Sequence, residues 1–129
     1  QRTDDSETLR TRLEQGIVDR VPDVFVNGSS DRVPNTSNIC FEGIEGEALV
    51  IALDLRGFAV SSGSACSSGA IQPSHVLTAM GRTKQQAKSS VRFSLGRENN
   101  QEQVDALIEA VVESVSHLRR LSPTYVVPA

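Results

Sequence analysis

A cysteine stands in the middle of a segment made mostly of serine and glycine. Residues 61–69 read SSGSACSSG, and Cys66 is one of only two cysteines in the chain. Its neighbours carry no bulk that could bury the thiol, and Gly63 and Gly69 give the backbone conformational freedom. Hydroxyls, backbone amides and a helix expected to begin near Pro73 could stabilise a thiolate. Two interpretations stay open from the local residues: a reactive thiol on a loop, or a buried, inert cysteine.

The spacing around Cys66 excludes several chemistries. No GxxxxGK[ST] motif follows it, so a phosphate-binding P-loop is excluded. A cysteine phosphatase would need an arginine six residues later, where the chain has Gln72. A zinc site is not supported because the available ligands are scattered: Cys40, Cys66, His75 and His117. A nucleophilic pair of Cys66 with His75 or His117 remains an alternative, although His75 lies at the start of a short helix and is expected to be structural.

Arg92 is the second residue that could do chemistry. It lies in SSVRFSLGR, where Val91, Phe93 and Leu95 alternate with polar side chains, as in a half-buried strand. One interpretation is an ordinary arginine on the exposed face of that strand. The other is a carboxylate clamp, since a guanidinium recognises a carboxylate through two parallel hydrogen bonds.

The elements that must position these residues follow from periodicity and turn signals. A four-residue apolar repeat and a following proline predict the first helix, and an apolar stripe predicts the last. The predicted helices are Ser6–Val21, Glu47–Arg56, Pro73–Met80 and Gln101–Leu121. The predicted strands are Val24–Val26, Asn38–Phe41, Phe58–Val60 and Ser90–Gly96. Long terminal helices around short strands predict an α+β fold, a small, mostly antiparallel sheet covered by helices on one side.

Composition bounds the class of protein. The 129 residues fit one domain, and 38% hydrophobic residues with 4% aromatics predict a mainly aliphatic core. A net charge of −3 makes nucleic acid an unexpected partner. Two distant cysteines predict reduced thiols inside the cell, with Cys40 as a buried apolar filler. The chain shows no membrane-spanning run or signal peptide, and its lack of an initiator methionine predicts a piece of a longer protein.

Taken together, the motifs resemble a known family. VPNTSNICFEGIEGEALVIALDLRG, VSSGSACSSG, PSHVLTAMG and SSVRFSLGR follow one another as in the C-terminal small domain of NifS/IscS-like cysteine desulfurases. These are enzymes of the class V aminotransferase family that depend on pyridoxal phosphate (PLP). The resemblance runs from about Ser6 to Tyr125, nearly the whole chain.

The resemblance implies an activity and a role for two residues. Cysteine desulfurases convert L-cysteine to L-alanine and pass the sulfur on as a persulfide. Cys66 would be the nucleophile that accepts the sulfur, and Arg92 would bind the substrate carboxylate. The acceptor would be an iron–sulfur scaffold or another sulfur-acceptor protein, for iron–sulfur cluster assembly or thiolation. The resemblance also implies a homodimeric full enzyme in the cytoplasm.

The chain also departs from the family. The family's PLP-binding lysine belongs to a large domain, and Lys84 and Lys88 lie in a polar stretch that does not match its motif. Residues 1–129 are therefore expected to be the small domain of an excised or split enzyme, inactive without the PLP-binding large domain. A non-catalytic sulfur-relay module and an interaction domain with an inert Cys66 are the alternatives. The pair of Cys66 and Arg92 favours the enzyme, since a relay needs no carboxylate clamp.

Overall fold

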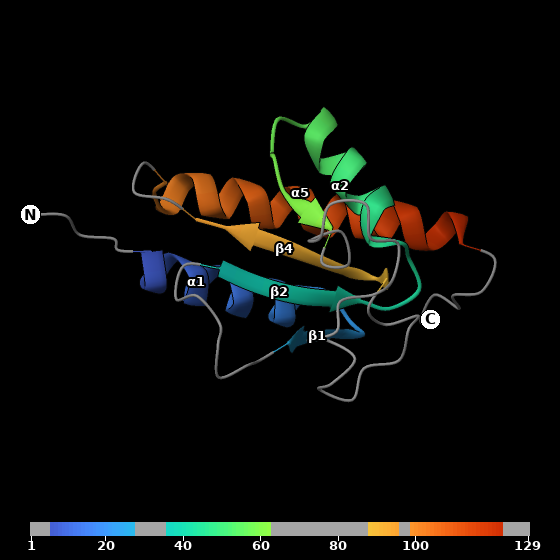
Figure 1. Cartoon of the computed structure of the whole chain (residues 1–129), viewed down its shortest axis with the longest axis horizontal. Coiled ribbons are helices and arrows are strands. Elements are labelled where there is room, and N and C mark those ends of the chain that lie inside the picture. The colour runs from blue at the N-terminus through green and yellow to red at the C-terminus, as the bar shows by residue number, and fades with distance from the viewer. Residues whose placement is uncertain (1–5, 28–35, 63–87, 96–98, 123–129) are drawn as a thin grey trace, which may run out of the picture.

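A computed structural model describes residues 6–27, 36–62, 88–95 and 99–122 of the chain. Its centre is a four-stranded sheet in the order β1-β2-β4-β3, in which every neighbouring pair is antiparallel. The strands are β1 (Val24–Asn27), β2 (Thr36–Phe41), β3 (Ser61–Ser62) and β4 (Ser90–Ser94). The predicted α+β fold with an antiparallel sheet is confirmed (Figure 1).

The helices form a layer on one face of this sheet. They are α1 (Ser6–Arg20), α2 (Gly46–Leu55) and α5 (Gln101–Leu121). Helix α1 contacts β1 and β2, α2 contacts β3 and β4, and both contact α5. In Figure 1, α1 runs behind β2. None of the described helices is long and apolar enough to cross a membrane.

The hydrophobic core lies between the sheet and the helix layer. Ile39 and Phe41 of β2 and Val91 and Phe93 of β4 are almost fully buried there. The rings of Phe41 and Phe93 meet edge to face, with centroids 6.3 Å apart. The apolar stripes of α1 and α5 supply mostly aliphatic side chains, as the low aromatic content predicts: Leu9, Leu13, Ile17, Val104, Leu107, Ile108, Val111 and Val115.

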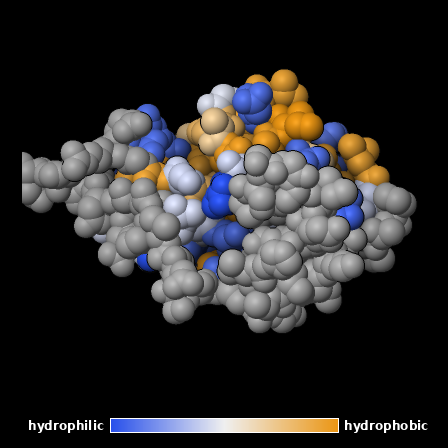
Figure 2. All heavy atoms as spheres, in the orientation of Figure 1, coloured by the Kyte–Doolittle hydropathy of each residue, from blue (hydrophilic) through white to orange (hydrophobic). Residues whose placement is uncertain are grey.

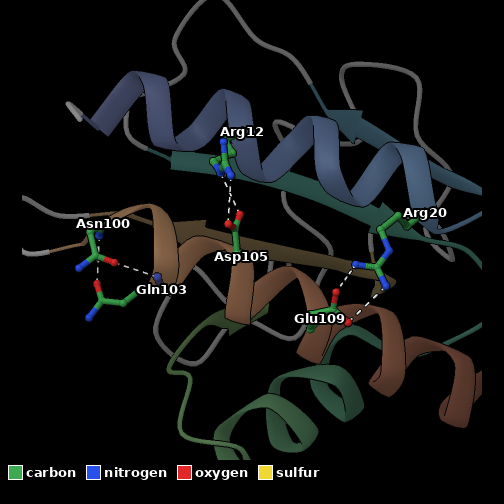
Figure 3. A network of polar contacts seen from close by, with 6 residues as sticks. All are labelled: Arg12, Arg20, Asn100, Gln103, Asp105 and Glu109. Atoms are coloured by element: carbon green, nitrogen blue, oxygen red, sulfur yellow. Dashed lines mark hydrogen bonds and ion pairs between the residues drawn. The ribbon is translucent and has the colours of Figure 1, made fainter. Parts of the chain in front are cut away.

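Helices α1 and α5 approach closely and are linked along their exposed edge. A Cβ atom at Gly16 would lie 2.5 Å from Cδ1 of Ile108, so glycine permits this approach. Arg12 donates from Nε to Asp105 at 2.8 Å and from Nη2 at 3.0 Å, a bidentate pair. Figure 3 shows this pair and a second one between Arg20 and Glu109, further along the same two helices.

Helix α2 is apolar on its outer side as well. Ile51 and Leu55, one turn apart, are 61% and 82% exposed. Figure 2 shows apolar atoms gathered over the part of the molecule where Figure 1 places α2. At its start, Gly46 is buried against β4, where a Cβ atom would lie 2.4 Å from the carbonyl oxygen of Ser90. The backbones of α2 and β4 therefore touch at this point.

Arg119 closes the end of the core through three backbone carbonyls. Its side chain is buried and donates to the carbonyl oxygens of Glu42 at 2.9 Å, Pro22 at 2.6 Å and Asp23 at 2.9 Å. Asp23 has a positive φ of 56°, which is uncommon for a residue other than glycine. A buried charge is tolerated here because its donors are satisfied. The local sequence pattern did not predict this role.

The predicted strand at Phe58–Val60 is wrong, since the strand is β3, Ser61–Ser62. Phe58 and Val60 instead pack against the core, and pairing begins only where Ser61 and Ser62 lie opposite Arg92 and Val91. Strand position depends on a partner for the backbone, and apolar content alone does not supply one.

The remaining boundaries shift by one or two residues, except for the last helix, whose predicted bounds are confirmed. Helix α1 ends at Arg20, one residue before the predicted Val21, and α2 begins and ends one residue earlier than predicted. Strand β1 runs one residue further, to Asn27, while β2 begins two residues before Asn38 and β4 ends two before Gly96. Thr36 of β2 pairs with Ser94 of β4, and this pairing sets both ends. The predicted helix Pro73–Met80 lies outside the described residues.

The contact of Gly46 with the β4 backbone predicts a sensitive position. We expect Gly46→Ala to lower the free energy of unfolding of the chain by about 1–3 kcal/mol, because a carbonyl of the sheet cannot move aside as a side chain can. Chemical denaturation measures this. Glu45→Ala is the control, since Glu45 is exposed and its side chain caps nothing. Equal stability of the two variants would contradict the close contact.

The ion pair between α1 and α5 predicts a pH dependence of stability. The hydrogen bond from Arg12 lowers the pKa of Asp105, so the pair stabilises the fold above the ordinary aspartate pKa. This contribution is lost as pH falls through the lowered pKa. Asp105→Asn should therefore be less stable than the wild type near neutral pH and equal to it in acid. Unfolding measured across this range with Glu45→Gln as control tests this, and a constant difference at all pH values would contradict it.

Candidate functional site

The site is built around Arg92, at the centre of β4. Its neighbours in sequence, Val91 and Phe93, point into the core under the helices. Since side chains alternate along a strand, Arg92 points to the opposite face, where it is half-buried. All the described helices cover the other face. The sheet therefore presents the guanidinium on the face that the described helices leave uncovered, called the helix-free face below in this sense.

A row of polar residues crosses all four strands at this level. Asn27 of β1 lies opposite Asn38 of β2, Asn38 opposite Arg92 of β4, and Arg92 opposite Ser61 of β3. Residues directly opposite in an antiparallel pair share a face, with Cβ atoms about 4.5–5.5 Å apart. The sheet, whose strands Figure 1 draws, thus lines up two amides, a guanidinium and a hydroxyl in the order of its strands.

Hydrogen bonds fix one half of this polar row. Nδ2 of Asn27 donates to Oδ1 of Asn38 at 3.2 Å and to the hydroxyl of Ser90 at 3.4 Å. Asn27 and Ser90 are buried, and Ser90 lies opposite Cys40 in the register. Cys40 is fully buried, which confirms the prediction for this residue. The strands hold the amide of Asn38 in a defined orientation beside Arg92.

Arg92 has no carboxylate partner within the described part of the chain. Arg12, Arg20 and Arg56 pair with acidic residues of α5, and Arg119 binds backbone carbonyls. A half-buried guanidinium with its donors available is suited to an anion, above all a planar carboxylate or a phosphate. The helix-free face can therefore bind an anionic group at Arg92.

Within the described ranges, none of the other predicted site residues lies beside Arg92. Cys66, His75 and Lys84 lie outside the described residues. His117 is exposed on α5, which belongs to the layer on the other side of the sheet from Arg92. Lys88 is exposed just before β4. No cluster of three or more His, Cys, Asp or Glu side chains suited to a metal ion occurs in the part of the chain that the structure describes.

Comparison with known protein families assigns the chain to a family. A family model described as "Aminotransferase class-V" matches residues 2–107. The chain belongs to the class V aminotransferase family. The matches imply that proteins of this family use PLP as their cofactor.

Individual relatives narrow the similarity to cysteine desulfurases. The chain is 50% identical over 116 residues to a cysteine desulfurase of Nostoc sp. The matched residues cover 89% of the chain and 29% of the relative. It is equally similar, over the same shares, to the cysteine desulfurase NifS of Azotobacter vinelandii. A cysteine desulfurase IscS of Serratia proteamaculans is 48% identical, covering 92% of the chain and 29% of the relative.

A solved structure supports the same relationship. The NifS-like protein of Rickettsia africae matches with a TM-score of 0.71 and 34% identity, covering 86% of the chain and 28% of that protein. The chain thus spans less than a third of the length of the relatives that it matches. The predicted resemblance to NifS/IscS-like cysteine desulfurases is confirmed.

Sequence reasoning missed Asn27, Asn38 and Ser90. The available signal was the alternation in TSNICF, which places Asn38 on the face opposite Ile39. The register that brings Asn38 to Arg92 joins segments 54 positions apart, and no local pattern encodes it.

Proposed function

We propose that this chain is the C-terminal small domain of a PLP-dependent cysteine desulfurase, in which Arg92 binds the carboxylate of L-cysteine and Cys66 accepts its sulfur. The observation that carries this proposal is the half-buried Arg92 on the helix-free face, without a carboxylate of its own in the described ranges. The 50% identity to proteins named cysteine desulfurase supplies the substrate class.

Arg92 has the chemistry to orient the substrate. Two parallel N–H donors of the guanidinium can bind both carboxylate oxygens, which fixes the plane of the carboxylate and the direction of the Cα atom. The amino group and the sulfur of L-cysteine are then left for the rest of the enzyme. Holding the reacting atoms in one geometry is itself a large part of catalysis.

Cys66 is kept near that substrate by the length of the chain. Ser62 of β3 lies opposite Val91, next to Arg92, and Cys66 follows only four residues later. A fully extended chain spans at most about 3.6 Å per residue, so the Cα atom of Cys66 lies within about 14 Å of that of Ser62. The connection supports the assignment of Cys66 as the sulfur acceptor.

The proposed reaction moves one sulfur atom. The Cys66 thiolate attacks the sulfur of L-cysteine, the carbon–sulfur bond breaks, and Cys66 becomes a persulfide while the carbon skeleton leaves as L-alanine after protonation. PLP, when bound, serves as the sink for the electron pair left on carbon. A thiol of the acceptor protein, such as an iron–sulfur scaffold, then takes the terminal sulfur.

The cofactor does not fit the described part of this chain. Lys88 is the one lysine in that part, and it is exposed rather than enclosed in a pocket. We therefore expect PLP to be held by a large domain outside this chain, and the chain alone to be inactive. The full enzyme would be a cytoplasmic homodimer, like the family it resembles.

Intact-mass analysis tests the nucleophile. The chain is mixed with L-cysteine and PLP, alone and joined to a PLP-bearing large domain from a cysteine desulfurase relative. We expect a reducible adduct with the mass of one sulfur atom, mapped to Cys66, only in the joined protein. Cys66→Ser should remove the adduct and sulfur release while leaving the PLP absorbance intact, and Cys40→Ser is the matched control. Normal alanine production by Cys66→Ser would contradict the assignment.

Substrate affinity tests Arg92. In the joined protein, Arg92→Ala should weaken binding of L-cysteine and L-alanine by about 2–4 kcal/mol, since a charge-assisted bidentate contact is lost. The change in PLP absorbance on binding measures this affinity. Arg120→Ala is the control, because Arg120 is an exposed arginine near the end of α5. An unchanged affinity for L-alanine would remove Arg92 from the site and favour a sulfur relay or an interaction domain.

A further inference from the structure

Asn38 lies directly opposite Arg92 in the register of β2 and β4. Both residues occupy the helix-free face, and an opposite pair brings the Cβ atoms within about 4.5–5.5 Å. An amide at this distance reaches the same ligand as the guanidinium. No carboxylate of the described ranges binds either side chain.

The hydrogen bond from Asn27 decides which groups Asn38 has left to offer. Its Oδ1 already accepts from Nδ2 of Asn27 at 3.2 Å. The Nδ2 group of Asn38 then contributes two N–H donors, and the guanidinium beside it contributes only donors. Two sets of donors cannot satisfy each other. A carboxylate, with two oxygens and about four lone-pair positions, can accept from both.

We propose that Asn38 is a second ligand of the substrate carboxylate and that Asn27 is a positioning residue that holds its amide in the required orientation. The inference rests on the proposed function of Arg92 and extends it to a donor set formed by β2 and β4 together. The neutral amide adds a directional hydrogen bond beside the charged one. Together the two residues select ligands that carry a carboxylate next to the amino group.

Asn27 suits the positioning role because it is itself fixed. Its side chain is only 6% exposed, and its Nδ2 group bridges Asn38 and the fully buried Ser90. A buried donor left without its partner costs free energy, so this arrangement resists rotation of either amide. The orientation of Asn38 is therefore set before any ligand arrives.

Measuring the binding of two ligands distinguishes a loss of carboxylate recognition from general damage to the site. In the chain joined to a PLP-bearing large domain, the dissociation constants of L-alanine and of ethylamine, which lacks the carboxylate, are measured from PLP absorbance. Asn38→Leu should raise the dissociation constant of L-alanine about tenfold, because one hydrogen bond to a charged group is lost. The dissociation constant of ethylamine should stay unchanged. For turnover, KM for L-cysteine should rise more than kcat falls.

Further variants keep the proposal falsifiable. Asn38→Asp preserves the acceptor for Asn27 but places a carboxylate beside Arg92, so L-alanine should bind still more weakly than in Asn38→Leu. Asn27→Ala should weaken the binding of L-alanine when it is introduced into the wild type but not when it is introduced into Asn38→Leu. A merely structural role of Asn27 would weaken binding in both backgrounds. Thr36→Val, on the same strand and face, is the control.

Each outcome is decisive for one of the two proposals. Wild-type affinity of Asn38→Leu for L-alanine, or equal weakening of ethylamine, overturns the role of Asn38. If Arg92→Ala weakens L-alanine and Asn38→Leu does not, only this inference fails. If Arg92→Ala itself has no effect, the carboxylate clamp of the proposed function fails as well.

Discussion

The alternation of side chains along β4 is the constraint on which the rest of the structure depends. Val91 and Phe93 fill the core beneath the helices, and this places Arg92 on the opposite face. A slip of one residue would bury the guanidinium among aliphatic side chains and expose two large apolar ones, which is strongly unfavourable. The burial that stabilises the sheet therefore also presents the arginine.

The two faces of the sheet carry different kinds of side chain. On the helix side, Gly46 lets α2 touch the β4 backbone, and α1 packs closely on α5 through Gly16. On the other side, the row from Asn27 to Ser61 consists of polar side chains at successive strands. Because these groups share strands but not faces, a substitution in the polar row leaves the apolar contacts under the helices in place.

The sequence predicted what is encoded locally. The apolar stripe predicts α5, and the alternation in SSVRFSLGR assigns Arg92 to its face. The capping box of Asn100 and Gln103 that begins α5, drawn in Figure 3, was not predicted. The sequence could not predict the partners of Arg92, because Asn38 arrives from a strand more than fifty positions away. Arg119 was missed for the same reason, since the carbonyls it binds lie 77 to 97 positions away. The strand β3 was misplaced because only its register with β4 defines it.

Under the proposed function, the position of β3 also limits where Cys66 can deliver sulfur. It is the edge strand next to β4, and the segment with Cys66 leaves directly from its end. Four residues of chain confine the Cα atom of Cys66 to within about 14 Å of that of Ser62 in every conformation of the chain. In the proposed reaction, Cys66 would therefore take up and hand over sulfur within this distance of the end of β3. For the proposed reaction, we therefore expect the sulfur acceptor to bring its own thiol to the β3 edge.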